Sequence, residues 1–334
     1  FTDASVFEGG VQGWKDAGGE LFKDVNVPSK SFGELVESKR HTPSLSAQEV
    51  KQLLDNKEDV VVVDVRRFDE YNTMSIPTGI SVPGAELVLR LPELAPNPKT
   101  KVIVNCAGRT RSIIGTQSLI NAGIPNEVNA LRNGTIGWTL AGQELDKGQS
   151  RKFREVSDNT TNEAAARARS VADRAGVKRV NLNTVHEWMK QADRTTYFFD
   201  TRTPEEFEHS HLPGFRSVPG GQLVQETEMV APVRGARIVL VDPSGGGVRA
   251  NMPASWLAQM AWEVYVLDDI KASDLTEQGV WKAPMPPLPK AATVDANTLS
   301  KWLKLDSNTI VVDFSTHANY IKGHIPGSWY ALRS

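Results

Sequence analysis

Cysteine is nearly absent from this chain of 334 residues, which contains a single one, Cys106. One thiol excludes an internal disulfide framework and any zinc site that needs several thiolates, and it fits a reducing, cytoplasmic setting. The net charge of −2 gives no basic field that would indicate a nucleic acid or an acidic membrane as partner. No apolar run approaches the length of a membrane span, so we expect no membrane partner.

The size and composition are those of an ordinary globular protein. A chain of 334 residues predicts two or three domains, and a hydrophobic content of 40% with 23% charged residues is sufficient for ordinary packed cores. Aromatic residues make up only 7%. Function must therefore be sought in local motifs, because the overall composition favours no special class of protein.

The lone cysteine lies in the stretch 101–123, which reads KVIVNCAGRTRSIIGTQSLINAG. Its first part is an apolar run typical of a buried strand, and its last part is a helical pattern that ends at Gly123. Cys106 thus lies in a loop where backbone N–H groups and the positive end of a helix dipole meet. Together with Arg109 and Arg111 they favour the nucleophilic thiolate and would hold a further anion. The alternative, a small buried apolar residue, explains neither the glycine nor the arginines that follow.

Repeats organise the rest of the chain. Residues 6–21 (VFEGGVQGWKDAGGEL) align without a gap on 130–145 (ALRNGTIGWTLAGQEL), so both segments close a unit. Because the second segment closes the unit of Cys106, we expect 6–21 to belong to another unit and to pack against neighbouring structure. The segment 217–224 repeats 81–88 almost letter for letter, and its register places Asp242 where the first unit has Cys106.

These motifs resemble the rhodanese (thiosulfate sulfurtransferase) superfamily, in which a six-residue loop begins with the catalytic cysteine. The family signature D-x-R … E-[YF] … G-H-I-P-G appears as DVR at 64–66, as DTR at 200–202 and as the complete GHIPG at 323–327. The first unit departs from it, because Met74 and Ser75 replace the usual Gly-His. The chain as a whole is similar to bacterial thiosulfate sulfurtransferases with several rhodanese domains in tandem.

The resemblance implies an α/β fold with tandem rhodanese-like domains, each a small, mostly parallel five-stranded sheet with helices on both faces. The expected parts are the tail of a preceding unit (1–27), a linker (28–40), an active-type domain with the Cys106 loop (41–148), a helical linker (149–176), a domain without cysteine and of inactive type (177–270), a Pro-rich linker (271–290) and the N-terminal part of a further unit (291–334). The arginines of the helical linker are most simply interpreted as a solvated face.

The implied reaction moves sulfane sulfur from thiosulfate to cyanide or a thiol through a persulfide on Cys106, without a cofactor or metal. The residues expected to bind the substrate are Ala107, Gly108, Arg109, Thr110, Arg111, Ser112 and Arg66. Arg66 is more simply explained as a structural partner of Asp64 that borders the pocket. Arg111 is an alternative partner for Asp64, and the sequence leaves open which loop arginine points inward.

Two other functions compete with sulfur transfer. Phosphatases of this fold carry an arginine six positions after the cysteine, where this chain has Ser112, so the smaller loop suits a sulfur atom better than a phosphate. A non-catalytic binding or redox-sensing module is the second alternative, because most units here show no thiol. His317 and His324 could suggest a metal site, but the resemblance places His324 in a structural turn.

Overall fold

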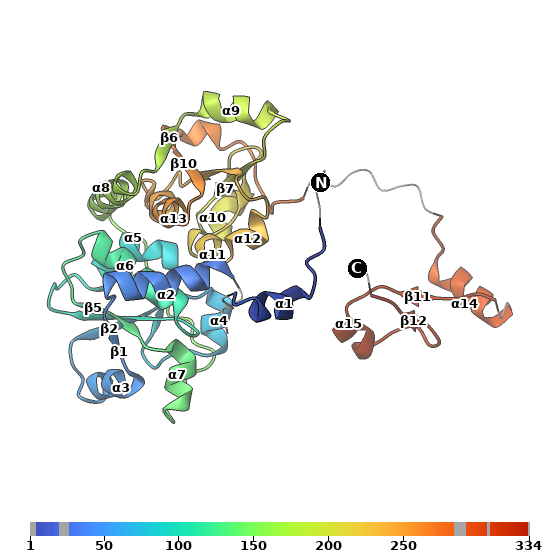
Figure 1. Ribbon diagram of the computed structural model, residues 1–334, viewed down its shortest axis with the longest axis horizontal. Coiled ribbons are helices and arrows are strands. Elements are labelled where there is room, and N and C mark those ends of the chain that lie inside the picture. Colours follow the sequence, from blue (N-terminus) through green and yellow to red (C-terminus); the bar gives the residue numbers. More distant parts are fainter. Residues whose placement is uncertain (1–4, 20–26, 284–291, 306–307, 333–334) are drawn as a thin grey trace. The chain divides into compact units, whose positions relative to one another are not determined.

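The computed structural model describes residues 5–19, 27–283, 292–305 and 308–332. It divides into two units, 1–281 and 282–334, and each is described here by itself (Figure 1). The predicted Pro-rich linker 271–290 lies partly outside the described residues, as do residues 1–4 and 20–26 of the segment 1–27.

A five-stranded sheet forms the centre of the first half of the larger unit. In sheet order its strands are β1 (Ser44–Leu45), β5 (Val128–Leu131), β4 (Lys101–Asn105), β2 (Val60–Asp64) and β3 (Ile80–Ser81). Every neighbouring pair is parallel. The surrounding helices are α3 (Ala47–Asp55), α4 (Phe68–Thr73), the 3-10 turn η1 (Gly84–Glu86), α5 (Leu87–Leu94), α6 (Thr110–Asn121) and α7 (Gly134–Leu140).

Both faces of this sheet are covered by helices because consecutive strand residues point to opposite sides. Val63 and Val104 belong to one buried cluster, which also holds residues of α5 and α6. Val62 and Ile103, one residue earlier on each strand, belong to a second cluster with residues of α3 and α7, including the fully buried Trp138. This arrangement leaves the carboxyl ends of β2 and β4 side by side at one edge of the sheet.

A second sheet repeats the topology. In sheet order its strands are β6 (Lys178–Val180), β10 (Glu263–Leu267), β9 (Arg237–Val241), β7 (Thr196–Asp200) and β8 (Arg216–Ser217). Its helices are α9 (Leu182–Lys190), α10 (Pro204–His209), α11 (Gly220–Gln225), α12 (Thr227–Val230), α13 (Val248–Gln259) and the 3-10 turn η2 (Ala272–Asp274). All of its strand pairs are parallel as well. The predicted fold, two tandem α/β domains with five-stranded sheets, is therefore confirmed.

The segment 28–40 is not the linker that the sequence predicts, but a helix, α2 (Pro28–Arg40), with one buried side. Val36 is 5% exposed and lies in a cluster with Ile113 of α6 and Trp256 of α13. The Phe32 ring meets the Trp256 ring edge to face, with 6.0 Å between centroids. The prediction fails because these contacts join residues about 80 and 220 positions apart, and a local pattern with few apolar residues does not reveal them.

The helical linker 149–176 contains a helix, α8 (Asp158–Arg174), that packs against both α5 and α13. It has a buried stripe, which consists of Ala164, Ala168, Val171 and Ala172. Its arginines are not simply the solvated face that the sequence predicts. Arg167 donates to the carbonyl of Gly123 at 2.6 Å, and Arg174 donates to that of Asn121 at 2.7 Å. Both side chains thus satisfy carbonyls at the end of α6.

Residues 6–19, the described part of the segment expected to pack against neighbouring structure, contradict that expectation. They form a short helix, α1 (Gly10–Asp16), in which no residue is buried. Val6 is 97% exposed and Val11 is 70% exposed. Within the segment, the rings of Phe7 and Trp14 meet edge to face, with 6.4 Å between their centroids.

The smaller unit contains α14 (Ala296–Leu305), β11 (Val312–Asp313), α15 (His317–Lys322) and β12 (Trp329–Tyr330), with the two strands parallel. His324 Nδ1 lies 2.9 Å from the carbonyl oxygen of Tyr320, and the two rings stack. His211 makes the same contact with Phe207 in the second domain. The structural turn predicted at His324 is confirmed, and within the described residues no group of three or more His, Cys, Asp or Glu side chains is placed to hold a metal ion.

None of the helices in the described ranges combines the length and the apolar character that crossing a bilayer requires.

Candidate active site

Cys106 lies at the centre of the first sheet, directly after β4. Because β4 pairs with β2 on one side and β5 on the other, the cysteine has structure on both flanks, and it is 1% exposed. The turn of residues 107–109 follows, and α6 begins at Thr110. The strand–loop–helix arrangement predicted around Cys106 is thus present, with the first turn of α6 directed at the loop.

The N-terminus of α7 makes hydrogen bonds to the cysteine loop. The carbonyl oxygen of Cys106 accepts from the backbone N–H of Thr135 at 2.9 Å and from its hydroxyl at 3.0 Å. The carbonyl of Ala107 accepts from the N–H of Ile136 at 3.1 Å. Gly134 has φ of +52°, and a Cβ there would lie 2.2 Å from the Cys106 carbonyl oxygen. Only glycine fits so close an approach, so this residue lets α7 position the cysteine.

The sequence identifies this Gly-rich segment as the end of the Cys106 unit but does not predict its contact with the cysteine loop. The available signal was its repetition, since the glycine of Asn133-Gly134 aligns with Gly10 in the first copy. Trp138 of the same segment has a structural role, because its ring is fully buried and its Nε1 donates to the carbonyl of Glu144 at 2.8 Å.

A short chain of hydrogen bonds leads away from the Cys106 sulfur. Sγ donates to the Ser112 hydroxyl at 3.4 Å, and that hydroxyl donates to the carbonyl of Arg109 at 2.8 Å. Ser112 lies in the first turn of α6 and is 1% exposed. If the thiol loses its proton, the same hydroxyl can turn and donate to the thiolate. Ser112 is therefore placed to stabilise a negative charge on the sulfur.

The two loop arginines differ in their surroundings. Arg109 binds Glu34 through Nε and Nη2, both at 2.8 Å, and it also contacts Glu37, so α2 holds it at the surface with 39% exposure. Arg111 is 18% exposed and donates to both carboxylate oxygens of Glu70, at 2.7 and 2.8 Å. Arg111 is thus the more enclosed arginine, and its acidic partner is Glu70 and not Asp64.

The electrostatics of Arg111 connect it with the cysteine. Burial lowers the pKa of Arg111, but the hydrogen bonds and charge of Glu70 outweigh this effect, and the pKa lies above the ordinary arginine value. The charge of Cys106 contributes to the same rise. Arg111 therefore stays protonated and interacts favourably with negative charge at the Cys106 sulfur.

Arg66 has its polar groups engaged elsewhere. Its Nε and Nη2 donate to the two oxygens of Asp64 at 2.9 and 2.7 Å, and Nη2 also donates to the carbonyl of Met74 at 2.6 Å. The residue is 4% exposed. Arg202 and Asp200 repeat the pair in the second domain, at 2.6 Å. A pair present in both domains, one of which has no cysteine, supports the interpretation that Arg66 is structural.

The matching loop of the second domain holds a carboxylate where the first has sulfur. The Asp242 side chain accepts from the N–H of Gly245 at 2.9 Å and from the N–H of Arg249 at 2.8 Å. The Arg249 guanidinium contacts it at 2.9 Å and also contacts Glu206 and Glu86. Burial opposes ionisation of Glu206, but the Arg249 charge lowers the pKa of Glu206 to about 2. In the second domain, the Asp242 carboxylate thus occupies the place among the loop N–H groups where an anion would bind. We call this place the cradle.

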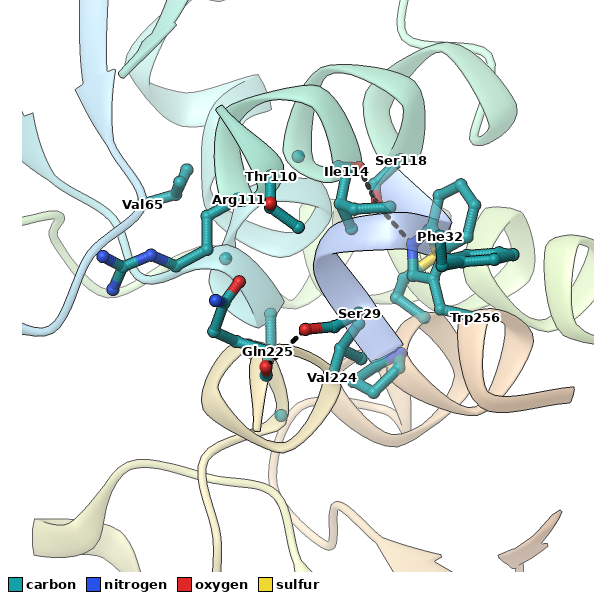
Figure 2. Close-up of a pocket in the computed structure, with 17 residues that line it drawn as sticks. Ser29, Phe32, Val65, Thr110, Arg111, Ile114, Ser118, Val224, Gln225 and Trp256 are labelled. Atoms are coloured by element: carbon teal, nitrogen blue, oxygen red, sulfur yellow. Dashed lines mark hydrogen bonds between the residues drawn. The ribbon is translucent and has the colours of Figure 1, made fainter. Parts of the chain in front are cut away.

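Helix α2 and both domains line a cavity beside the first turn of α6. Figure 2 shows Ser29 and Phe32 on one side, Thr110, Ile114 and Ser118 of α6 on another, and Trp256 beyond them. The Trp256 indole donates to the Ser118 hydroxyl at 2.8 Å. The Arg111 side chain extends toward the opposite end of this view from Trp256 (Figure 2). Gly33 of α2 faces Thr110 so closely that a Cβ would lie 2.9 Å from its methyl carbon, so α2 lies directly against the start of α6.

Comparisons with known proteins agree with this geometry. The family model for rhodanese-like domains matches residues 46–141 and 181–269, together more than half of the chain. The crystal structure of a thiosulfate sulfurtransferase from Pseudomonas aeruginosa matches 97% of this chain with 65% identity and a TM-score of 0.90. This chain spans 61% of that protein.

Two curated proteins match over shorter stretches. An HTH-type transcriptional regulator of Mycobacterium tuberculosis is 34% identical over 99 residues, which are 29% of this chain and 43% of that protein. A Bacillus subtilis protein named as a candidate sulfur carrier is 28% identical over 97 residues, which are 29% of this chain and 51% of that protein. The chain thus matches about half of each curated relative.

Proposed function

This chain belongs to the family of rhodanese-like domains, and we propose that its Cys106 unit is a sulfurtransferase that takes sulfane sulfur from thiosulfate and passes it to cyanide or a thiol. The observation that carries this proposal is the contrast between the two matching loops. The second domain fills its cradle with the Asp242 carboxylate, and the first has the Cys106 sulfur in that place. A cradle that holds a carboxylate in one domain suits a persulfide anion in the other.

In the first step the Cys106 thiolate attacks the outer sulfur of thiosulfate. A new S–S bond forms on Cys106, the S–S bond of thiosulfate breaks, and sulfite leaves with the electron pair. The negative charge moves to the terminal sulfur of the persulfide, where the Ser112 hydroxyl and the N–H groups at the start of α6 can stabilise it. Arg111 attracts the dianionic donor and stabilises the negative charge that develops on the departing sulfite.

In the second step the acceptor attacks the terminal sulfur. Cyanide forms a C–S bond and departs as thiocyanate, and the electron pair of the broken S–S bond returns to Cys106 as thiolate. A thiolate acceptor gives a persulfide by the same exchange. Charge and atoms balance in both steps, so the proposed reaction needs no cofactor or metal. A cytoplasmic setting, in which the thiol stays reduced, belongs to the same proposal.

The proposal also assigns roles along the chain. Residues 41–148 form the active unit, with Ala107, Gly108, Arg109 and Thr110 as parts of the loop around Cys106. Residues 177–270 form a unit that does not transfer sulfur, because a carboxylate cannot take it up. The repeats support the interpretation of 1–27 and 291–334 as parts of two further units.

Intact-mass analysis after incubation with thiosulfate and then with cyanide tests the proposal. The protein should gain the mass of one sulfur atom, lose it again when cyanide is added, and release thiocyanate. Cys106→Ser should show neither change, whereas Cys106→Ser and the native chain should unfold at similar temperatures. A native protein that is reduced beforehand, freed of the reductant and then gains no sulfur from thiosulfate would exclude the proposed reaction and favour a binding or redox-sensing role.

A further inference from the structure

The two domains of the larger unit meet across an approximate two-fold relation. Residues 64–106 of the first domain correspond to 200–242 of the second, so Gly84 matches Gly220 and Ala85 matches Gly221. A Cβ on Gly221 would lie 3.2 Å from the Cα of Gly84, and a Cβ on Gly220 would lie 3.0 Å from the Cβ of Ala85. Each contact is the image of the other, so equivalent residues of the two domains face each other across this interface.

One buried ion pair crosses the same interface. Arg249 of the second domain contacts Glu86 of the first at 3.0 Å, and the two side chains are 1% and 4% exposed. The image of Arg249 is Arg111, because each is the second residue of the helix after its loop. The image of Glu86 is Gln222. The two-fold relation therefore places Gln222 of the second domain opposite Arg111 of the first.

A cavity of about 300 Å³ between the domains agrees with this placement, since both Arg111 and Gln222 line it. Its walls also include Lys152, whose Nζ lies 3.7 Å from the centre of the Phe68 ring. Arg249 does not line the cavity. The first domain thus presents its loop arginine to the space between the domains, and the second does not.

The two arginines differ in the number of carboxylates around them. Arg249 has three carboxylate partners, Asp242, Glu206 and Glu86. Arg111 has one recorded ion-pair partner among the described residues, Glu70, which is the image of Glu206. Cys106 replaces the second carboxylate of the cradle, and the uncharged Gln222 replaces the third. Arg111 and Glu70 together carry no net charge, whereas Arg249 and its three carboxylates are net negative, so the surroundings of Arg111 repel an anion less.

We propose that Gln222, a residue of the domain without cysteine, is a specificity-determining residue of the Cys106 site. Its neutral amide leaves the interdomain cavity beside Arg111 open to the anionic end of a sulfur donor, such as the sulfonate of thiosulfate. A carboxylate at this position would pair with Arg111 as Glu86 pairs with Arg249, and would close the cavity to anions. This inference rests on the proposed sulfurtransferase function, and it gives the second domain a part in the reaction.

Alkylation of Cys106 tests the inference without relying on sulfur transfer. Iodoacetate is anionic and iodoacetamide is neutral and of similar size, so the ratio of their rates at Cys106 reports the charge that a reagent meets as it approaches the sulfur. Gln222→Glu should lower this ratio about tenfold, the size expected for one added charge at a partly solvated site. Gln222→Met should leave the ratio within about twofold of native, because it adds no charge. Gln222→Lys should raise it.

Gln259→Glu is the matched control, since it adds the same charge to the same domain at the far end of α13 from Arg249. An equal fall of the ratio in Gln259→Glu, or no fall in a folded Gln222→Glu, overturns the inference. Gln222 is only partly buried, so these variants are expected to fold, and if Gln222→Glu does not, an unchanged ratio in Gln222→Lys overturns it instead.

The outcomes for the two proposals are distinguishable. A native protein that is alkylated with the expected charge dependence but takes no sulfur from thiosulfate would overturn the proposed function. The inference that Gln222 controls the access of anions would still hold. If thiosulfate does load Cys106, Gln222→Glu should raise the KM for thiosulfate more than it lowers kcat. A Cys106 that neither reagent modifies would overturn both, because no donor could then reach the sulfur.

Discussion

Arg111 donates to both carboxylate oxygens of Glu70, and it lies at the start of α6. There the charges of Arg111 and Cys106 interact. Arg109, two residues earlier, is held by α2 at the protein surface. We expect Arg111→Gln to slow sulfur loading from thiosulfate about a hundredfold, the usual cost of removing one group that stabilises developing charge. Arg109→Gln should slow it less than about threefold, because charges at the surface are screened.

Single-turnover loading followed by mass spectrometry measures both rates. Arg111→Lys is the matched variant, since it keeps the charge but cannot bind Glu70 in the same two-point manner. It should recover part of the lost rate. A larger effect at Arg109 than at Arg111 would mean that the surface arginine, and not the enclosed one, meets the donor.

Gly134 joins the Gly-rich segment to the cysteine loop, and its replacement tests whether α7 positions Cys106. Gly134→Ala would place a methyl group 2.2 Å from the Cys106 carbonyl oxygen, so the loop or α7 must move. We expect the loading rate to fall at least about tenfold, because a shift of about 1 Å at a reacting group is costly. The thermal midpoint should fall as well.

Gly142→Ala separates the two effects of that replacement. Gly142 also has a positive φ, +75°, but a Cβ there has no atom within 4 Å. It should cost only the backbone strain, about 1–2 kcal/mol of unfolding free energy, and leave the loading rate unchanged. Equal loss of activity in both variants would show that the contact with Cys106 is not what matters.

The sequence predicted the parts of this site that are local in the chain. The strand, the cysteine loop and the helix follow one another within residues 101–123, and the repeats identified Asp242 as the counterpart of Cys106. The partners of the arginines could not be predicted, because Glu70 is 41 residues from Arg111 and Glu34 is 75 residues from Arg109. Such pairs depend on how strand ends and α2 come together in the fold.

Helix α2 shows the same limit for the fold. Its apolar residues are too few to indicate a buried helix, and their partners come from both domains. Val36→Ala should lower the unfolding free energy by roughly 1–3 kcal/mol, because Val36 is 5% exposed and belongs to the same buried cluster as Ile113 and Trp256. Leu35→Ala on the same helix should have little effect, because Leu35 is 51% exposed. Urea unfolding measures both, and equal values for the two variants would return 28–40 to the role of a linker.

The cluster around Arg249 predicts how stability depends on pH. Arg249 lowers the pKa of Glu206 to about 2 in the folded protein, against an ordinary value of 4.5. The folded state therefore binds the Glu206 proton less readily than the unfolded state does. The stability that this pair contributes is complete above about pH 4.5 and is lost as the pH falls from there toward about 2.

Glu206→Gln removes the titrating carboxylate but keeps a side chain of the same size. The variant should be less stable than the native protein at pH 6. In urea titrations its unfolding free energy should also fall less steeply between pH 5 and pH 3, and the difference in slope should correspond to the uptake of about one proton on unfolding. Glu155→Gln, at an exposed position, should follow the native curve. Parallel curves for Glu206→Gln and the native protein would mean that Arg249 is satisfied by Asp242 and Glu86 alone, and that Glu206 only completes the capping box of α10.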